Sequence, residues 1–378
     1  MTLARVRVRG FRTARDVSIE LGPLRALVGD ANAGKSNLLR AIHVLLDPHA
    51  PPLAREDVAA DDGEVQIEGV LLDGRPLSLR DRSAAPPVLF FPATLRAAAL
   101  VAGKGGPARR AAELVAGALA DADTPHHGLV RGLDSCCALG VTGHVILMEE
   151  PELFLRPQAQ RYLYRLLHRL AGEGNQVIYS THSPAFLNVA RLEELVLVER
   201  DPLAGTRVVH PQRIAADEEF RVLSEFDATR SELFLARAAV LVEGLTEKLT
   251  LPFVFAALGH DADLEAISIV ECGGKSNIPL FARICKAAGV PFVAVHDRDA
   301  EPGREPILGE QILNARIAKV AGRRRTVVLE PDFEGVAGLR GSSKKPERAW
   351  RRFGALTAEE VPEPLARVVR LAVRMARD

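Results

Sequence analysis

Hydrophobic and polar positions follow two different patterns along the chain. In the first part, residues 3–9 alternate with a period of two, which is typical of a half-exposed strand. An amphipathic helix is predicted after Ser36, through about Leu46. Residues 92–130 are rich in Ala and Gly, which predicts helices joined by loops, with a small basic loop over 103–110. Further strands are predicted at 17–21, 25–28, 65–72, 145–148 and 177–180, a helix at 158–170, and a closing hairpin at 196–199 and 206–209.

From residue 238 onward, short apolar runs alternate with longer helical ones. Strands are predicted at 239–242, 267–270, 292–295 and 326–329, and helices near 246–258, 277–288 and 307–320. This order predicts a compact parallel sheet. The end of the chain is basic and helical. We therefore predict a first domain over 1–210, a helical linker over 211–236, a second domain over 237–340 and a basic tail over 341–378.

Composition narrows the class of protein without naming a function. The chain has 378 residues, 47% hydrophobic and 26% charged, which leaves room for roughly two soluble domains. Lys+Arg and Asp+Glu are equal at 49 each, so any basic surface is local. Aromatic residues make up 5%, which argues against a platform that stacks bases. The four cysteines lack metal-type spacing, which fits a reducing compartment. The sequence also shows no apolar run long enough for a membrane span and no leader pattern. We therefore expect a cytoplasmic protein.

A glycine-rich loop lies between a predicted strand and a predicted helix. Residues 29–36 fit the pattern G-x-x-x-x-G-K-[ST], in the context that defines a phosphate-binding loop. In such a loop the backbone N–H groups surround the phosphates of ATP. Lys35 would reach the β- and γ-phosphates, and Ser36 would bind Mg²⁺. The candidate nucleotide-binding residues here are Gly29, Asn32, Gly34, Lys35, Ser36 and Asn37.

Two further strand ends carry residues that suit the same site. Glu149 and Glu150 follow the apolar run 145–148. Glu149 would hold Mg²⁺ through water, and Glu150 would orient or activate the attacking water. His182 follows the next strand, at a position from which it would sense the γ-phosphate.

Carboxylates also gather at the strand ends of the second domain. Glu243 follows one strand, and Glu247 would point back to the same place from the first turn of a helix. Asp297 and Asp299, two apart in an extended stretch, would lie on one face and share a metal. A second metal would bind Asp332 and Glu334, which have the same spacing. Crowded carboxylates repel one another and are costly to desolvate, so divalent cations are their natural neutralisers.

The alternative for these acids is that they are solvated loop residues or helix caps, which is what a single D-x-D mostly is. Three acidic clusters at consecutive strand ends favour the metal site. Two metals close together would activate water and stabilise the leaving oxygen of a phosphodiester. Between these clusters, Gly273 and Gly274 predict a structural turn, and Lys275 is a candidate contact to a DNA backbone.

The motifs together resemble a known family. Phe11-Arg12, GDANAGKSNLLRAI (29–42), LMEEPELFLRPQ (147–158) and YSTHSP (179–184) resemble the ABC-type ATPase heads of the SMC/RecF class. Within that class they are similar to OLD (overcoming lysogenization defect) nucleases, which join such a head to a Toprim domain in this order. The Toprim resemblance covers LVEGLTE (241–247), ECGGKSN (271–277), HDRD (296–299) and LEPDFE (329–334).

The resemblance implies an α/β fold with an ABC-type P-loop ATPase domain followed by a Toprim domain with a Rossmann-like parallel sheet. It implies a DNA substrate, ATP with Mg²⁺, two Mg²⁺ or Mn²⁺ ions at the Toprim site, and a homodimer through the heads. It also implies a tail lysine that completes the site: Lys345, with Lys344 as the alternative. Phage defence or DNA repair is the implied setting, and a partner helicase is a further candidate.

The chain departs from the family pattern in the head. The opposing subunit of such ATPases supplies a Ser-Gly segment before the acidic strand, but residues 125–132 read PHHGLVRG, without the serine. No clear Q-loop glutamine is present in the sequence, since Gln66 falls within a predicted strand. ATP binding is therefore predicted more firmly than rapid ATP turnover.

Toprim domains also serve topoisomerases and primases, and the residues argue against both. A topoisomerase needs a nucleophilic tyrosine, but Tyr162, Tyr164 and Tyr179 all lie in the first domain. A primase would be expected to have zinc-binding cysteines, and none have that spacing. The first hypothesis is therefore a metal-dependent DNA endonuclease regulated by its ATPase head. The alternatives are an ATP-driven clamp on DNA or a partner protein, with weak or no nuclease activity, and a simple ATPase switch.

Overall fold

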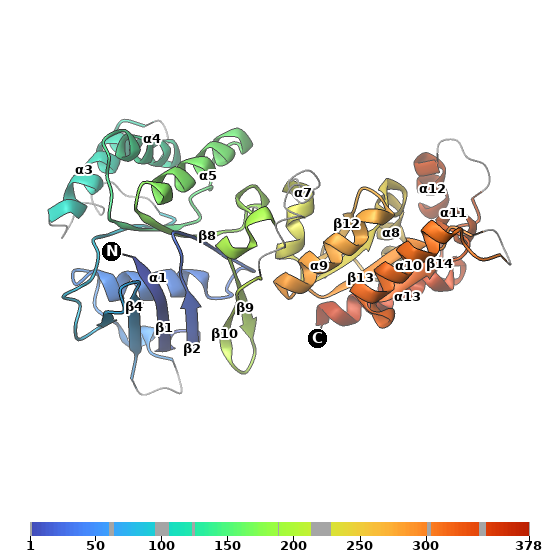
Figure 1. The fold of residues 1–378 in the computed structure, drawn as a ribbon, viewed down its shortest axis with the longest axis horizontal. Helices are drawn as coiled ribbons and strands as arrows, with labels where there is room; N and C mark the ends of the chain where they lie inside the picture. Colours follow the sequence, from blue (N-terminus) through green and yellow to red (C-terminus); the bar gives the residue numbers. More distant parts are fainter. Residues whose placement is uncertain are drawn as a thin grey trace. The chain divides into compact units, whose positions relative to one another are not determined.

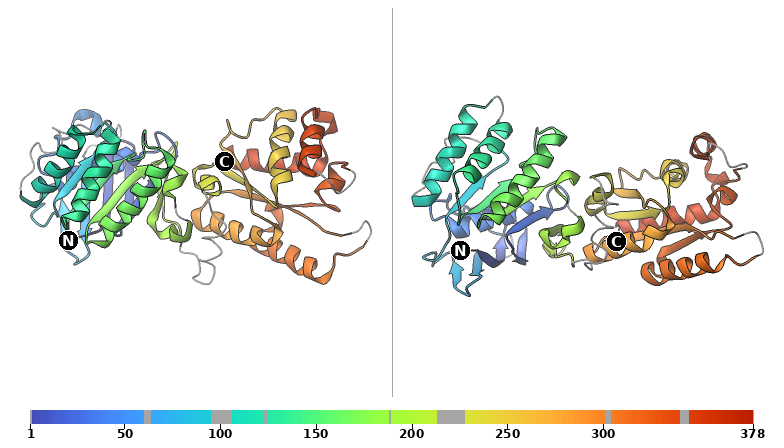
Figure 2. Two further views of the ribbon diagram at one scale, coloured as in Figure 1. Left: turned by 90° about the horizontal axis from the view of Figure 1, so that it is seen from above. Right: turned by 45° about the horizontal axis from the view of Figure 1, so that its top comes forward.

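The computed structural model describes residues 2–59, 64–94, 106–122, 125–187, 189–212, 228–300, 304–339 and 345–377. It divides into two compact units, Met1–Pro211 and Gln212–Asp378. Figure 1 shows the elements of each unit, and Figure 2 shows them from two other sides. No helix among the described residues combines the length and the apolar character that crossing a membrane requires.

Ten strands of the described residues form one sheet in the first unit, in the order β5-β4-β1-β2-β10-β9-β3-β8-β7-β6. The half that contains β3, β6, β7 and β8 is parallel, whereas β1 pairs antiparallel with β2 and β4. The strands are β1 (Leu3–Phe11), β2 (Ala14–Glu20), β3 (Leu24–Val28), β4 (Gln66–Leu71), β5 (Pro76–Ser78), β6 (Val88–Phe91), β7 (Val145–Glu149), β8 (Gln176–Thr181), β9 (Leu195–Asp201) and β10 (Gly205–Val209).

Helices cover both faces of this sheet. The helix α1 (Lys35–Leu46) packs its apolar side against β1, β4, β7 and β8. Figure 1 shows α3 (Gly106–Ala120), α4 (Pro125–Ala138) and α5 (Pro157–Gly172) grouped on the side away from α1. Short 3-10 turns lie at Arg55–Asp57, Pro184–Phe186 and Val189–Glu194.

The prediction of a basic loop over 103–110 is wrong for residues 106–110. Residues 106–110 form the first turn and a half of α3, and 103–105 lie outside the described residues. The helix forms because Ala108, Ala111, Ala112 and Val115 are all buried, at the spacing of one helix face. The arginines between them remain on the exposed side, so basic character did not indicate a loop here.

The second unit is built on a parallel sheet with the order β12-β11-β13-β14. Its strands are β11 (Ala238–Val242), β12 (Ile267–Glu271), β13 (Phe292–Asp297) and β14 (Thr326–Leu329). The predicted α/β fold class is confirmed. Since all four strands run the same way, the residues that follow them meet at one edge of the sheet.

Helices sandwich this second sheet. One face packs against α8 (Leu245–Ala257) and the C-terminal α13 (Glu363–Arg377), and the core contains Val240, Val242, Val368 and Val369. The helices α9 (Ile278–Ala288) and α10 (Leu308–Ala321) also pack against these strands. The short α11 (Phe333–Val336) follows β14, and α12 (Lys345–Phe353) packs on α8.

The smaller turns complete the list of elements. They are α7 (Ala228–Ser231) and 3-10 turns at Glu232–Leu235, Lys275–Asn277, Arg323–Arg325 and Ala358–Glu360. Of the linker predicted over 211–236, residues 213–227 lie outside the described residues, and 228–235 are helical.

A buried glutamine joins separate strands of the first unit. Gln176, at the start of β8, is 1% exposed. Its Oε1 accepts a hydrogen bond from the Leu3 N–H (2.9 Å), and its Nε2 donates to the carbonyls of Leu3 (2.8 Å) and Gly22 (2.9 Å). One side chain therefore satisfies three backbone groups far from it in sequence.

Replacing this glutamine should destabilise the first unit. Gln176→Leu keeps the size but leaves buried backbone groups without partners, each of which costs about 1–3 kcal/mol. We expect the free energy of unfolding to fall by roughly 2–4 kcal/mol in urea titrations. The exposed Gln158→Leu is the control and should change stability by less than about 0.5 kcal/mol. Equal effects of the two substitutions would contradict the role given to Gln176.

Candidate functional site

Two glycines of the phosphate-binding loop are required by the strands beside it. Gly29 has φ 154°, and a Cβ there would lie 1.9 Å from the carbonyl oxygen of Val198 in β9. Gly34 has φ 113°, and a Cβ there would lie 2.2 Å from Oγ1 of Thr206 in β10. The loop thus turns between β3 and α1 without room for side chains at these two positions.

Most of the predicted nucleotide-binding residues line one pocket of about 430 Å³. Its lining consists of Thr13, Ala31, Asn32, Gly34, Lys35, Ser36, Asn37, Glu150, His182 and Arg200. Lys35 is buried, and its Nζ donates to the carbonyls of Gly29 and Asp30, both at 2.8 Å. Burial lowers the pKa of Lys35, while the nearby Glu150 opposes that shift.

The acidic strand end lies beside this loop. Glu149 is the last residue of β7, and its carboxylate accepts hydrogen bonds from the Ala93 N–H (3.3 Å) and from Ser36. Burial raises the pKa of Glu149. Glu150 has a left-handed backbone (φ 44°), and its Oε1 lies 3.2 Å from Nε2 of His182. Burial and the charge of Lys35 lower the pKa of His182.

A third glutamate of the same segment was missed by the sequence reasoning. Glu152 is 6% exposed, and its Oε1 accepts from the Thr181 hydroxyl (2.5 Å) and from the His182 N–H (3.0 Å). Burial raises its pKa. Glu152 therefore fixes the end of β8 and the backbone of His182. The only signal was a third acid in the segment 149–152, and it does not reveal the partner 30 residues away.

Threonines behind the loop were missed as well. The Thr13 and Thr206 hydroxyls lie 2.7 Å apart, and Thr206 Oγ1 donates to the Ala33 carbonyl at 3.1 Å. Asn37 Nδ2 in turn donates to Thr13 Oγ1 at 2.8 Å. These contacts attach the loop and α1 to β10 and to the β1–β2 turn. Single threonines so far apart in sequence form no motif, so only the fold reveals them.

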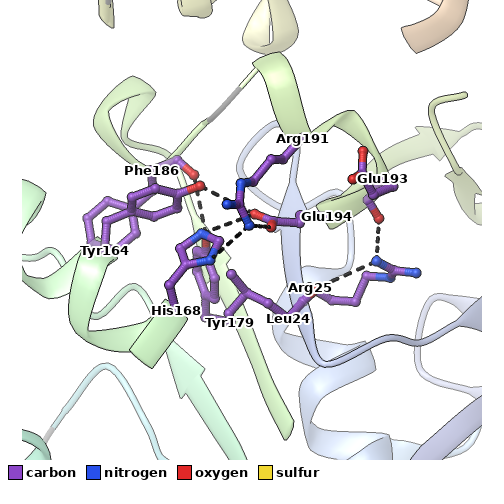
Figure 3. Close-up of polar contacts among 9 residues, drawn as sticks. All are labelled: Leu24, Arg25, Tyr164, His168, Tyr179, Phe186, Arg191, Glu193 and Glu194. Carbon is purple, nitrogen blue, oxygen red and sulfur yellow. Dashed lines mark hydrogen bonds and ion pairs between the residues drawn. The ribbon is translucent and has the colours of Figure 1, made fainter. Parts of the chain in front are cut away.

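The segment between β8 and β9 is held by a polar cluster (Figure 3). Glu194 accepts from the Tyr164 hydroxyl (3.3 Å), lies 3.3 Å from Nε2 of His168, and pairs with Arg191 at 3.2 Å. Tyr164 and His168 belong to α5, and Figure 3 shows their rings turned toward Glu194. On the other side, Arg25 of β3 donates to the carbonyl of Glu193. The residues after His182 are thus anchored to both a helix and a strand.

The glycines of the segment 125–132 have a packing role. The segment lies in α4, and Gly128 and Gly132 face α3. A Cβ on Gly128 would lie 2.7 Å from the Leu119 Cα, and one on Gly132 would lie 2.7 Å from the Val115 Cα. Close packing of two helices therefore explains these glycines. The side chain of His126 lies outside the described residues.

At the carboxyl edge of the second sheet, two carboxylates link three strand ends. Glu243 follows β11, and its Oε1 accepts from the Asp297 N–H at 2.7 Å. Asp297 is the last residue of β13, and its Oδ1 accepts from the Phe333 N–H after β14, at 2.8 Å. Glu247 lies in the first turn of α8 with 7% of its surface exposed. The structure therefore brings Glu243, Glu247 and Asp297 to the place that the sequence predicted.

These three carboxyl groups are difficult to ionise together. Burial raises the pKa of Glu243 to about 7 and that of Glu247 to about 7. Burial and the neighbouring charges of Glu243 and Asp299 raise the pKa of Asp297 to about 8. The charges of Asp297 and Glu334 also raise the pKa of Glu247, so these groups form one electrostatic cluster. Such a cluster favours binding of a cation.

The donor set fits Mg²⁺ or Mn²⁺ in its chemistry. All of the candidate ligands are carboxylate oxygens, which hard divalent cations prefer. Among the described residues, however, no group of three or more His, Cys, Asp or Glu is already arranged to hold a metal ion. Mg²⁺ commonly binds through one or two carboxylates, with water and substrate phosphates as its other ligands. This edge therefore suits a site that substrate completes, rather than a closed protein cage.

Asp299 is not in the extended stretch that the sequence suggested. β13 ends at Asp297, and Asp299 has φ 57°, with its N–H donating to the Pro331 carbonyl at 3.1 Å. The prediction that Asp297 and Asp299 share the face of a strand is therefore wrong. Asp299 is nevertheless close enough to raise the pKa of Asp297.

Lys275 binds the carboxylate of Asp299. Its Nζ lies 2.7 Å from Oδ2 of Asp299 and 2.7 Å from Oε2 of Glu310, and its side chain is 7% exposed. It is thus an internal counter-charge, and not the contact to a DNA backbone that the sequence suggested. The preceding glycines, Gly273 (φ 71°) and Gly274 (φ 122°), form the turn, and the Gly274 N–H donates to the Glu243 carbonyl at 2.8 Å.

Asp332 and Glu334 are placed differently from the prediction. Asp332 is the N-cap of α11, and its Oδ1 accepts from the Gly335 N–H at 2.7 Å. Glu334 lies in the first turn, so the two side chains do not alternate along a strand. The helix-cap alternative thus applies to Asp332. Lys344 lies outside the described residues, as does the side chain of Lys345, the first residue of α12.

Comparison with known proteins identifies both units. Residues 234–299 match the family described as "Overcoming lysogenization defect protein-like, TOPRIM domain", and residues 1–75 and 140–187 match "AAA ATPase domain". The OLD nuclease of Thermus scotoductus is 37% identical over 247 residues, which cover 60% of this chain and 47% of that protein. The Old nuclease of Escherichia phage P2 is 28% identical over 161 residues, covering 41% and 28%. The chain thus spans less than half the length of these relatives.

Two solved structures are also similar. The C-terminal region of the Burkholderia pseudomallei OLD protein covers 38% of this chain and 98% of its own, with 17% identity and a TM-score of 0.31. The SMC head domain from Thermotoga maritima covers 56% and 100%, with 14% identity and a TM-score of 0.38. Both likenesses are weak, and the assignment rests on the sequence matches.

The fold and the matches define a class of protein in which an ATPase domain is followed by a Toprim domain. This chain carries an OLD-like Toprim domain after an ATPase domain, and the first of these matches the Toprim family over residues 234–299.

The carboxylate cluster should make the metal-free protein less stable at high pH. Unfolded carboxyl groups titrate near 4, whereas the pKa of folded Asp297 is about 8. Between these values the folded state binds more protons, so the free energy of unfolding falls as pH rises. With a chelator present, Asp297→Asn should therefore melt several degrees above the wild type at pH ~8.5 and close to it at pH ~4.5, since 1 kcal/mol is roughly 2–4 °C here.

The exposed Glu330→Gln serves as the control for that measurement, because the Glu330 side chain is 64% exposed and its replacement should have little effect at either pH. A wild-type melting temperature above that of Asp297→Asn throughout this pH range would contradict the assigned charge state.

Proposed function

We propose that this protein is a divalent-metal-dependent DNA nuclease whose Toprim unit hydrolyses phosphodiester bonds under the control of an ATP-binding head. The observation that carries the proposal is the chain of hydrogen bonds from Glu243 through Asp297 to the Phe333 N–H, with the buried Glu247 beside it. Similarity to two OLD nucleases supports the same reaction class.

In this proposal, the carboxylates hold two Mg²⁺ or Mn²⁺ ions, which would activate water and stabilise the leaving oxygen. Glu243, Glu247 and Asp297 are the ligands best supported by position and burial. Asp299 and Glu334 are further candidate ligands at the edge of the cluster. Asp299 is held by Lys275, and the charge of Glu334 acts on Glu247. Asp332 has its second oxygen to offer, and Lys345 or Lys344 remains the proposed tail lysine.

The head would bind ATP with Mg²⁺ in the pocket above the phosphate-binding loop. Lys35 and Ser36 would contact the phosphates and the metal, and Asn32 and Asn37 also line the pocket. Glu149 accepts a hydrogen bond from Ser36, which suits a carboxylate that would hold Mg²⁺ through water. Glu150 and His182 face each other at 3.2 Å, which suits a pair that orients water and senses the γ-phosphate.

The second candidate is an ATP-driven clamp that binds DNA with weak or no cleavage. The degenerate signature segment 125–132 favours it, because the segment lacks the usual serine and rapid ATP turnover is then less strongly supported than ATP binding. Both candidates use a homodimer formed through the heads, in the cytoplasm. Neither the described residues nor the comparisons point to a partner helicase.

Nicking of supercoiled plasmid DNA tests the nuclease. Glu243→Gln and Asp297→Asn should each reduce Mg²⁺- or Mn²⁺-dependent nicking by about 100-fold or more, because each removes a charged metal ligand. Glu330→Gln, an exposed acid near the same edge, is the control and should cut like the wild type. Undiminished nicking by both site variants would rule out this site.

Lys35→Ala separates the two candidates. This substitution should abolish ATP binding. Any effect that ATP has on the nicking rate of the wild type should then be absent from the variant. Gel filtration of the wild type with and without ATP, run beside the nicking assay, reports the clamp. ATP-dependent dimerisation without cleavage under either metal would favour the clamp over the nuclease.

A further inference from the structure

One face of α10 carries cations and aliphatic side chains without an exposed acid. The exposed residues of this helix occupy one stripe, at the spacing of a helix face. The stripe consists of Leu308, Gln311, Ile312, Ala315, Arg316 and Lys319, and the following 3-10 turn adds the exposed Arg323, Arg324 and Arg325. The acid of α10, Glu310, is half-buried and binds Lys275 on the inner side.

The cations of this stripe are available. Within the described residues, Arg316, Lys319, Arg323 and Arg324 form no ion pair. Several exposed arginines of other helices are paired within their own helix, as Arg109 is with Glu113 and Arg351 is with Glu347, although Arg161 and Arg367 form no ion pair within the described residues. A solvated helix face normally mixes both signs of charge. The single sign on α10 therefore indicates a surface that meets an anion.

The aliphatic end of the stripe is exposed to an unusual degree. Ile307, Leu308 and Ile312 are 76%, 72% and 61% exposed. They occupy the start of α10, next to Glu310, and the cations occupy the other end. A partner for this face must offer negative charge where the cations lie and less polar surface at the aliphatic end.

We propose that the stripe from Leu308 through Arg325 (the α10 stripe) binds the sugar-phosphate backbone of duplex DNA and leads it to the carboxylate site. The inference rests on the proposed nuclease function. The fourteen residues of α10 span about 21 Å, which is roughly six base pairs. Arg316, Lys319 and Arg323 contact phosphates, and Leu308 and Ile312 contact sugars nearer the site.

The stripe is physically connected to the carboxylate edge. Glu310 lies one turn or less from Leu308 and Ile312, but on the inner side of α10. Lys275 Nζ contacts both Glu310 and Asp299 at 2.7 Å, and Asp299 lies two residues beyond Asp297. The first turn of α10 is therefore fixed beside the candidate metal ligands. A DNA strand bound along α10 would therefore be directed toward the candidate metal ligands.

The salt dependence of DNA binding tests this inference. The variant Arg316→Gln/Lys319→Gln/Arg323→Gln removes three of the proposed phosphate contacts. Binding of a labelled duplex of about 30 base pairs would be followed by fluorescence anisotropy with a chelator, at several KCl concentrations. Each lost contact lowers the slope of log K against log salt by about 0.9, so the triple variant should lose about 2.7 from the slope and bind at least about tenfold more weakly at low salt.

A matched variant controls for the loss of charge. Arg161, Lys286 and Arg367 are exposed cations on α5, α9 and α13, without an ion pair in the described part of the chain. Replacing all three by Gln removes the same charge and should leave the slope near that of the wild type. Single variants Arg316→Gln and Lys319→Gln, each expected to lower the slope by about 0.9, guard against a folding defect of the triple variant.

Two results would overturn the inference: an unchanged slope in the triple variant and both single variants, or an equal loss in the matched variant. Wild-type plasmid nicking measured in parallel keeps the two proposals apart. If the wild type cuts DNA while the slope is insensitive to the α10 stripe, the inference fails and the nuclease stands. If the wild type neither cuts nor binds DNA, both fail.

Discussion

The second unit depends on one constraint: two partly buried carboxylates accept backbone N–H groups from the next strand end. Glu243 receives the Asp297 N–H, and Asp297 receives the Phe333 N–H. These bonds fix the ends of β11, β13 and β14 relative to one another at one edge. They also place acidic groups close together and partly out of water, so the pKa of Asp297 rises to about 8. The geometry that orders this edge thus also creates its need for a cation.

The protein meets part of that need with its own lysine. Lys275 lies between Asp299 and Glu310, so one ammonium group offsets two carboxylates at the border of the cluster. Glu243, Glu247 and Asp297 have no equivalent cation in the described residues at such a distance. The contacts of Lys275 with Asp299 and Glu310 are therefore consistent with structural ion pairs, and the three carboxylates without such a cation are consistent with a site for metal and phosphate. The same lysine connects that site to α10.

The sequence was sufficient wherever local chemistry decides the structure. The alternation of apolar strands and helices predicted the parallel sheet, and parallel strands necessarily bring Glu243 and Asp297 to one edge. The glycines at 29 and 34 were predictable because the loop approaches β9 and β10 too closely for a Cβ. These features depend on periodicity and on steric limits, which a sequence displays directly.

The errors arose where distant residues decide the backbone. Asp299 adopts a left-handed conformation because Pro331 accepts its N–H and Lys275 binds its carboxylate. Asp332 became a helix cap because α11 begins at Phe333, immediately after the strand. Glu152 and Thr206 support the candidate nucleotide site through partners 29 and 173 residues away. Such contacts have no local pattern, so spacing along the chain could not reveal them.

The central claim is that Glu243, Glu247 and Asp297 form a cation site that holds protons when no metal is bound. Calorimetric titration of the chelator-treated protein with Mn²⁺ at pH ~7, in buffers of different ionisation enthalpy, measures metal affinity and proton release together. The account predicts Mn²⁺ binding with release of at least about one proton, and loss of both in Asp297→Asn. Mn²⁺ binding that releases no proton and persists unchanged in Asp297→Asn would contradict it.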